Sequence, residues 1–237
     1  MSSVNATNLH QLVKILKDIK VKLTPELPNY ANYGLFYSNH EISTGLINDS
    51  IEMKINLEVG KFHYYDAKLV TGGPFDLTIS DFDRDFRQFL SEMDLELSFD
   101  RLNPITLEEM KRFSSFAFEA KRVLEQFRLT LEGKYSQVYL WGHNFDFDCV
   151  WYGDDGKQID VGVSPGDLNH PDPYLYITHH PFNRQLIRDE LPFGSWITEP
   201  WKGILVPWAS LTDKPDQEIV LIIQGLFNEI KLGLEKY

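Results

Sequence analysis

The sequence has one cysteine, few basic residues and no long apolar run, and each shortage excludes a class of protein. With Cys149 alone, no disulfide can form within the chain. Cys149 alternates with Phe147 and Trp151 in an apolar stretch, so we interpret it as a small buried side chain and not as a nucleophile. The 23 lysines and arginines stand against 35 aspartates and glutamates, which gives a formal net charge of −12. This excess of negative charge argues against nucleic acid and against anionic membranes as partners.

No apolar run approaches the ~20 residues that a membrane-spanning helix needs. The first residues, MSSVNATNLH, lack the basic and apolar regions of a signal peptide, so we expect a cytoplasmic protein. Strong catalytic motifs are missing too: the sequence has no phosphate-binding glycine loop, no G-x-S-x-G, no H-E-x-x-H and no paired C-x-x-C. P-loop nucleotide hydrolysis, hydride transfer on a Rossmann fold and thiol redox chemistry therefore lose their usual sequence support.

Apolar spacing predicts both helices and strands in each half of the chain. Helices are expected over 9–23, from a capping box at Ser80 and Asp83, over 106–132, and from Asp213 to 234. Strands are expected at 34–37, 51–59, 61–69, 75–79, 95–99, within 135–152, and at 174–178 and 203–207. Gly72-Gly73-Pro74 is expected to form a turn.

Helices that close runs of strands, without regular alternation of strand and helix, are typical of the α+β class. We therefore predict antiparallel sheets packed against long helices. Residues 1–102 and 103–237 each read as helix, strands and closing helix. One interpretation is that the chain consists of two pseudo-repeated halves, the second of which carries the candidate site. The other interpretation is one continuous domain.

The densest mixture of Trp, His, Asn and Asp lies in YSQVYLWGHNFDFDCVWY, residues 135–152. We predict two strands that fold about a turn at Gly142, His143 and Asn144. In a strand that begins at Asn144, Asp146 and Asp148 point to one face and the aromatic residues to the other. Two carboxylates about 7 Å apart on one face, with His143 at the rim, suit an acid/base pair or a shared cation. A solvated strand face is the structural alternative.

The histidines and aromatic residues of the second half supply further candidates. Adjacent His179 and His180 point to opposite faces of a strand, so both cannot easily bind one metal ion. Aromatic residues with polar groups line many small-molecule pockets, but they also fill ordinary cores. The predicted ligand-binding residues are Trp141, Asn144, Tyr176, His179 and Trp196, beside His143 and Asp146 as predicted catalytic residues.

Several motifs in order resemble an uncharacterised family that is found mainly in bacteria, domain of unknown function 5996. They are LWGHNFDF (140–147), GVSPGD (162–167), PYLYI (173–177), WITEPW (196–201) and VPW (206–208). Members commonly read L-W-P-H-H-F-D-L in the first motif, so Gly142 replaces a proline and Asn144 replaces a second histidine. Asn is a poor ligand for transition metals, so a metal site in relatives would be weakened here. The resemblance implies recurring motifs and no established activity.

Three hypotheses follow. The first is a small-molecule-binding protein with an aromatic, His and Asp pocket in the second half. The second is a hydrolase in which His143 acts as base and Asp146 orients it, with or without a metal ion. The third is a structural or interaction protein whose motifs serve packing alone. The sequence identifies no cofactor, no metal and no oligomeric state.

Overall fold

The computed structural model describes residues 7–66, 69–188 and 190–236. Every strand pair in this part of the chain is antiparallel, which confirms the predicted α+β class. The helices are α1 (Thr7–Leu23), α2 (Phe82–Glu92), α3 (Leu107–Arg128) and α4 (Asp216–Glu235), with short 3-10 turns η1 (Pro28–Tyr33), η2 (Asp154–Gly156), η3 (Arg184–Leu186) and η4 (Trp208–Ser210). The strands are β1 (Gly34–Ser38), β2 (Glu41–Ser43), β3 (Ile51–Asn56), β4 (Lys61–Asp66), β5 (Leu69–Asp76), β6 (Lys134–Tyr135), β7 (Tyr139–Trp141), β8 (Asp146–Tyr152), β9 (Gln158–Ser164), β10 (Tyr174–His180), β11 (Ser195–Ile197) and β12 (Gly203–Pro207).

The chain divides into two compact units, which we describe separately. The N-terminal unit runs to Phe118 and includes Tyr139–Phe145, whereas the C-terminal unit consists of Glu119–Val138 and the chain from Asp146 onward. The division between the units falls inside α3, whereas the sequence pattern placed a boundary after residue 102. The hypothesis of repeated halves stays a prediction.

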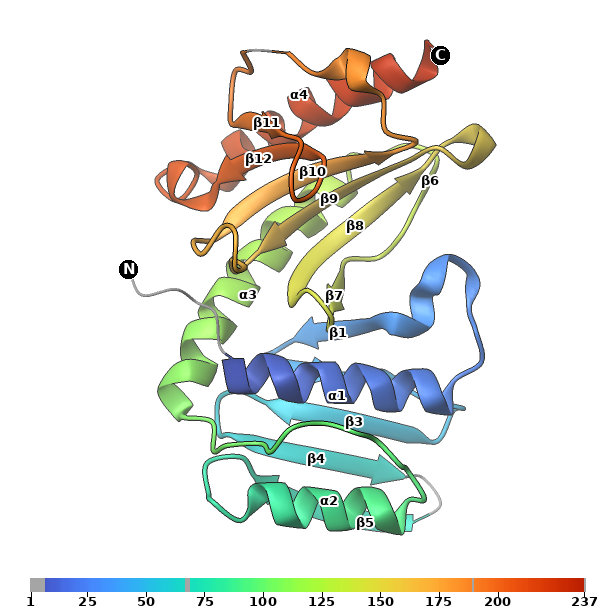
Figure 1. The fold of residues 1–237 in the computed structure, drawn as a ribbon, viewed down its shortest axis with the longest axis vertical. Helices are drawn as coiled ribbons and strands as arrows, with labels where there is room; N and C mark the ends of the chain where they lie inside the picture. The colour runs from blue at the N-terminus through green and yellow to red at the C-terminus, as the bar shows by residue number, and fades with distance from the viewer. Residues whose placement is uncertain (1–6, 67–68, 189, 237) are drawn as a thin grey trace. The chain divides into compact units, whose positions relative to one another are not determined.

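The N-terminal unit is an antiparallel sheet in the order β7-β1-β2-β3-β4-β5, covered by helices (Figure 1). The apolar stripe of α1 is fully buried at Leu9, Leu12 and Leu16, as its spacing predicts. Helix α2 packs Phe86 edge-on against Phe62 of β4, with 5.1 Å between the ring centroids. This apolar layer between helices and sheet is the core of the unit.

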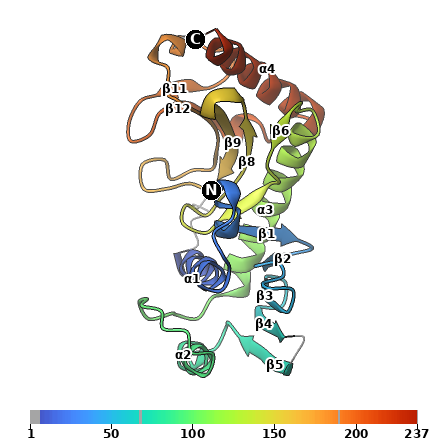
Figure 2. The same cartoon turned by 90° about the vertical axis from the view of Figure 1, so that its right-hand side faces the viewer.

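The strands of the C-terminal unit are antiparallel and follow the order β11-β12-β10-β9-β8, and β6 also pairs with β8. Helix α4 and the last turns of α3 lie on one side of this sheet (Figure 2). Trp151 of β8 and Phe127 of α3 both contact Phe227 of α4, at centroid distances of 6.0 Å and 5.5 Å. The predicted α4 stripe, Ile219, Ile223, Leu226, Phe227, Ile230 and Leu234, is buried.

Several local predictions are wrong. Segment 95–99 is coil, and the predicted turn at 72–74 lies inside β5, where Tyr64 pairs with Gly72. The predicted capping box at Ser80 and Asp83 does not form. Helix α2 begins at Phe82 after Asp81, and Asp81 makes no side-chain cap. The Asp83 carboxylate accepts hydrogen bonds from Arg87 and from the N–H of Leu102. Strand β9 was not predicted, because it is short and lies between glycine- and proline-rich turns.

The predicted start of the strand after the central turn is also wrong. Phe145 has a left-handed backbone with φ of 63°, and its N–H donates to the Trp141 carbonyl at 2.7 Å. Asn144 and Phe145 therefore belong to a four-residue turn, and β8 begins at Asp146. Phe145 does not share a strand face with Phe147.

Candidate functional site

The register of β8, β9 and β10 sorts their side chains onto two faces of the C-terminal sheet. Asp148 pairs with Gly162, which pairs with Tyr176, and these three positions lie on the face opposite α4. Residues two positions away along each of these strands point to the same face. We call this set the acidic face, and it consists of Asp146, Asp148, Asp160, Tyr174 and Tyr176.

The centre of the acidic face is the contact between Asp146 and Tyr176. The Tyr176 hydroxyl donates to Asp146 Oδ2 at 2.5 Å and lies 3.4 Å from Asp148 Oδ2. This geometry confirms the prediction that the two carboxylates share a face. The exposed fractions of Asp146 and Asp148 are 4% and 8%. A buried charge of this kind is costly unless it is fully hydrogen-bonded.

Gly162 makes the contact between strands β10 and β8 possible. A Cβ atom at Gly162 would lie 2.3 Å from the Tyr176 ring and 2.7 Å from the Phe147 carbonyl oxygen. The tyrosine ring therefore occupies the space that any other side chain on β9 would fill. Without a side chain at this position, Tyr176 extends across β9 to reach carboxylates two strands away.

The second oxygen of Asp146 has no partner. Its Oδ1 atom is buried and forms no hydrogen bond with any described residue. Burial raises the pKa of Asp146 to about 6, and the nearby Asp160 adds to this rise, whereas the hydrogen bond from Tyr176 opposes it. Burial, with the charges of Asp146 and Asp148, also raises the pKa of the Tyr176 hydroxyl well above its ordinary range, so this group stays protonated and donates.

Asp160 occupies the neighbouring position on β9 and is held by β10. Its Oδ2 accepts a hydrogen bond from the Thr178 hydroxyl at 3.0 Å. Burial raises the pKa of Asp160, while the hydrogen bonds from Thr178 and Gln158 lower it. Asp146 and Asp160 form no ion pair with a lysine or arginine in the described part of the chain.

Aromatic rings flank the acidic face on its β10 side. Trp201 stacks on Tyr174 with centroids 6.0 Å apart and planes 18° apart, and it meets Tyr176 at 6.0 Å and 63°. The Tyr174 hydroxyl donates to Asp167 Oδ2 at 2.6 Å, while Asp167 Oδ1 accepts from the N–H groups of Asn169 and His170. The S-P-G-D element is thus a turn that fixes Tyr174.

His179 and Trp196 form a separate pair on the side of the sheet that faces α4. Their rings are 5.9 Å apart and perpendicular, at 86°. The Asn183 N–H donates to His179 Nε2 at 3.0 Å, so the neutral ring carries its proton on Nδ1. Burial lowers the pKa of His179, and both His179 Nδ1 and Trp196 Nε1 are buried without a hydrogen-bond partner among the described residues.

A hollow of about 290 Å³ adjoins this pair at Phe182, which stacks on the His179 ring with 5.2 Å between centroids. The residues that line it are Lys157, Pro181, Phe182, Asn183, Gln185 and Leu234.

The turn that contains His143 belongs to the N-terminal unit and is anchored there by its backbone. His10 Nε2 lies 3.1 Å from the Gly142 carbonyl oxygen and 3.2 Å from that of His143. The His10 ring stacks on Phe145 at 4.8 Å, and Phe145 stacks on Phe113 of α3 at 4.1 Å. The turn therefore packs through Phe145 and through carbonyl oxygens.

The polar side chains of this turn do not take part in this packing. His143 and Asn144 are exposed, and Trp141 meets the His143 ring edge-on at 6.0 Å. Although the His143 side chain is exposed by surface area, neighbouring atoms desolvate its ring in part, and this desolvation, with the charges of Lys17 and Lys14 on α1, lowers the pKa of His143. No feature of this turn within the N-terminal unit identifies His143 as a base.

The structure thus divides the predicted site residues into three groups. Asp146 and Tyr176 lie together on the acidic face, and His179 and Trp196 lie together on the opposite face of the same sheet. The third group, Trp141, His143 and Asn144, lies in the N-terminal unit. The pairing of His143 with Asp146 as base and orienting acid stays a prediction.

Sequence reasoning did not assign Tyr174, Asp160 or Trp201 to the site. For Asp160, the missed signal is the alternation of Ile159, Val161 and Val163 in β9, which places Asp160 on the polar face. For Trp201 no periodic signal exists, since it follows β11 in a loop.

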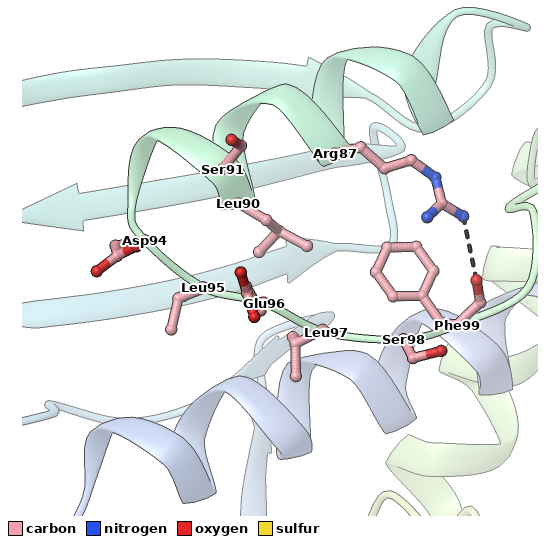
Figure 3. A pocket seen from close by; sticks show the side chains of 9 residues that line it. All are labelled: Arg87, Leu90, Ser91, Asp94, Leu95, Glu96, Leu97, Ser98 and Phe99. Carbon is pink, nitrogen blue, oxygen red and sulfur yellow. Dashed lines mark hydrogen bonds between the residues drawn. The ribbon is translucent and has the colours of Figure 1, made fainter.

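The N-terminal unit has a pocket of about 590 Å³ between α2 and the segment that follows it (Figure 3). Its one cationic group is already engaged. The Arg87 guanidinium lies 4.2 Å from the Phe99 ring, donates to the carbonyl oxygens of Phe99 and Asp100 at 3.2 Å, and donates to Asp83 at 3.1 Å. Arg87 thus holds segment 94–100 against α2, and we assign no ligand to this pocket.

No group of three or more His, Cys, Asp or Glu side chains among the described residues is placed to hold a metal ion. Over the same residues, no helix is both long and apolar enough to cross a membrane. Comparison of the chain with known protein families, characterised proteins and solved structures finds no match. Membership of the family named from the sequence motifs therefore stays a prediction.

Proposed function

We propose that this chain is a cytoplasmic small-molecule-binding protein whose ligand binds at the acidic face and donates a hydrogen bond to Asp146 Oδ1. The observation that carries the proposal is the buried, unpartnered oxygen of a carboxylate that Tyr176 already holds by its other oxygen. Almost all buried polar atoms in folded proteins have a partner, so an exception at a fixed polar cluster indicates a place for a ligand group.

The surroundings of Asp146 support this role over a purely structural one. A structural carboxylate gains stability when both oxygens accept hydrogen bonds, and its pKa then falls. Asp146 shows the opposite behaviour, since burial raises its pKa to about 6. Strongly perturbed titratable groups are found preferentially at functional sites.

A hydrolase is the second candidate, and the observation that favours it is the same pKa near neutrality, which suits a general acid or base. In this version Asp146 transfers the proton and Tyr176 orients it. His143 belongs to the N-terminal unit, so its part in this version stays a prediction. Any ligand found in the binding screen should be followed over time by mass spectrometry, since conversion by the wild type and none by Asp146→Asn would establish catalysis.

The test of binding is a thermal-shift screen of the full chain against a metabolite library. A ligand at about 100 times its dissociation constant stabilises the folded state by roughly 2.7 kcal/mol, or about 5–10 °C in melting temperature for a chain of this size. The shift should disappear in Asp146→Asn and Tyr176→Phe. Asp155→Asn, which removes an exposed carboxylate in the turn between β8 and β9, is the matched control and should keep it.

The proposal fails if every ligand found shifts the Asp146→Asn variant as strongly as the wild type. It also fails if the library gives no shift with the wild type while the same library shifts a control protein.

A further inference from the structure

The hollow beside Phe182 lies on the side of the C-terminal sheet that faces α4, opposite the acidic face. All of its lining residues belong to the C-terminal unit. Its volume of about 290 Å³ is at the lower end of the range of small-molecule pockets, roughly 300–1,000 Å³. Except for the buried Leu234, the lining side chains are half-buried or exposed, so a small molecule can enter from solvent.

The lining of this hollow includes a cation and no carboxylate. Lys157 is half-buried there and forms no ion pair with a described residue. A second cation stands beside the wall, since Lys202 Nζ lies 5.1 Å from the centroid of the Phe182 ring. Asp154 and Asp155 precede Lys157 in an exposed turn and do not line the hollow. The local charge is therefore positive in an acidic chain.

Two side-chain amides on the same wall supply further hydrogen-bond donors. Asn183 Oδ1 accepts from the Gln185 N–H at 2.9 Å, so the amide oxygen is engaged and the NH₂ group of Asn183 is left to donate. The Asn183 N–H donates to His179 Nε2 at 3.0 Å, which fixes this residue against β10. Together with Lys157, the NH₂ groups of Asn183 and Gln185 match the two acceptor oxygens of a carboxylate.

The remaining walls of the hollow are apolar. Phe182 is held by the His179 ring, which stacks on it at 5.2 Å and 29°, while Pro181 and Leu234 complete the apolar surface. An inorganic anion gains nothing from apolar walls, whereas a hydrocarbon group gains free energy by leaving water. Phosphate groups are also recognised most often by the paired donors of arginine, and no arginine lines this hollow. The walls therefore favour an organic anion with an apolar part.

We infer that this hollow binds a small organic carboxylate. The carboxylate accepts hydrogen bonds from the Lys157 ammonium and from the NH₂ groups of Asn183 and Gln185. The hydrocarbon part lies against Phe182 and Leu234. Since the net charge of −12 repels anions at long range, this site selects its ligand through contacts. No lining residue belongs to the acidic face, so the inference goes beyond the proposed function and does not depend on it.

The experiment is isothermal titration calorimetry of the full chain with five probes. Benzoate, benzyl alcohol and benzylamine share a ring and differ in charge, while acetate and inorganic phosphate are anions without an apolar body. Benzoate should bind about tenfold more tightly than benzyl alcohol, because only the carboxylate makes charge-assisted hydrogen bonds. Acetate and phosphate should bind more weakly than benzoate. Benzylamine should show no binding that depends on Lys157.

Variants locate the binding. Lys157→Gln should weaken benzoate by about tenfold, and Lys157→Arg should retain most of the affinity because the charge is kept. Lys111→Gln, which removes an exposed lysine of α3 in the N-terminal unit, is the matched control and should leave binding unchanged. Benzoate should also shift the side-chain amide signals of Asn183 and Gln185 in NMR spectra. Melting temperatures of the variants check that each one folds.

Three outcomes would overturn the inference. They are equal affinity for benzoate and benzyl alcohol, benzoate affinity unchanged in Lys157→Gln, and no binding of benzoate at millimolar concentration. Phosphate that binds more tightly than benzoate in a Lys157-dependent manner would also overturn it, in favour of an inorganic anion. Asp146→Asn should bind benzoate like the wild type, so this result is distinct from the test of the acidic face.

Discussion

Asp146 is held in a state that costs the folded protein free energy. A carboxylic acid whose pKa rises from 3.8 to about 6 on folding binds its proton more tightly in the folded chain. Its stabilising effect is fully present below about pH 4 and is lost as the pH rises to about 6. The rise corresponds to about 3 kcal/mol, since each pKa unit is worth about 1.4 kcal/mol. Proteins tolerate such costs mainly where a group has a function.

The first prediction follows from this linkage. Asp146→Asn cannot ionise, so its stability relative to the wild type should increase between pH 4 and pH 7, by up to about 3 kcal/mol. The neighbouring Asp160 carboxyl faces the same group, and its own titration reduces this figure, whereas the Tyr176 hydroxyl stays protonated over this range. Urea unfolding at several pH values measures the difference.

Asp155→Asn controls for the loss of one negative charge at an exposed position. A difference between Asp146→Asn and the wild type that stays constant over this pH range would show that the carboxylate is not perturbed by burial.

At the level of single elements, the crossing of β9 by the Tyr176 ring depends on one missing side chain. We predict that Gly162→Ala destabilises the C-terminal unit by about 1–3 kcal/mol, as overpacked substitutions do, because its Cβ would overlap the tyrosine ring and a backbone carbonyl. The same change should also abolish Asp146-dependent binding, since Tyr176 has to move. Chemical denaturation and calorimetry on one preparation test both effects.

Gly225→Ala is the matched control. Gly225 lies in α4, and its added Cβ would meet no atom within 4 Å. The alanine should stabilise the chain by about 1 kcal/mol, because glycine is the poorer helix former. If Gly162→Ala instead behaves like Gly225→Ala, the sheet can accommodate the extra atom and the position is not critical.

The turn between β7 and β8 gives a second prediction at this scale. Phe145 is fully buried between His10 and Phe113, whereas His143 is exposed. Phe145→Ala should cost about 3–5 kcal/mol, the usual range for a buried phenylalanine. His143→Ala should change stability by less than about 0.5 kcal/mol, as exposed substitutions do. Thermal unfolding of the two variants checks the difference.

Equal losses in these two variants would show that the His143 side chain takes part in folding. A loss of ligand binding in His143→Ala at unchanged stability would show that His143 belongs to the binding site.

The sequence predicted the long periodic elements well and the short ones poorly. Helix α4 and strand β12 form where the spacing of their apolar residues predicts them. The apolar residues of α4 repeat over many turns, and only a helix places all of them on one buried face. Segment 95–99 has the alternation of a strand but lies as coil, with Arg87 bonded to its backbone carbonyl oxygens. The hydrogen bonds from Arg87 of α2 cannot be predicted from the residue pattern of segment 95–99 itself.

The same limit applied to the candidate site. That Asp146 and Asp148 share a face follows from a period of two along one strand. That Tyr176 reaches them depends on the order of the strands and on Gly162 between them, which no local pattern encodes. That Trp201 stacks on Tyr174 depends on the path of a loop. Sequence reasoning named Asp146 and Tyr176 separately, but it missed the contact between them, which sheet pairing makes, and the contact of Trp201, which a loop makes.

At the scale of the whole molecule, charge is the property that bears most directly on the ligand. The formal net charge of −12 surrounds a face whose own ionisable side chains are mainly carboxylates. Such a field attracts small cations and repels anions over distances up to the Debye length, which is about 10 Å at 0.1 M salt. The overall charge of the chain therefore favours small cations over anions as ligands.

The last prediction separates these long-range and short-range contributions. Raising sodium chloride from about 20 mM to about 300 mM should slow the association of a cationic ligand found in the thermal-shift screen and weaken its binding by about 3–10-fold, because the field of the whole molecule is screened. Dissociation should change little, since the hydrogen bond to the buried Asp146 is formed at contact and is screened much less. Stopped-flow fluorescence with Trp201 as reporter, compared between wild type and Trp201→Leu, measures both rates. If salt instead changes only the dissociation rate, the electrostatic attraction of the ligand comes from the acidic face alone, and the net charge of the chain does not speed association.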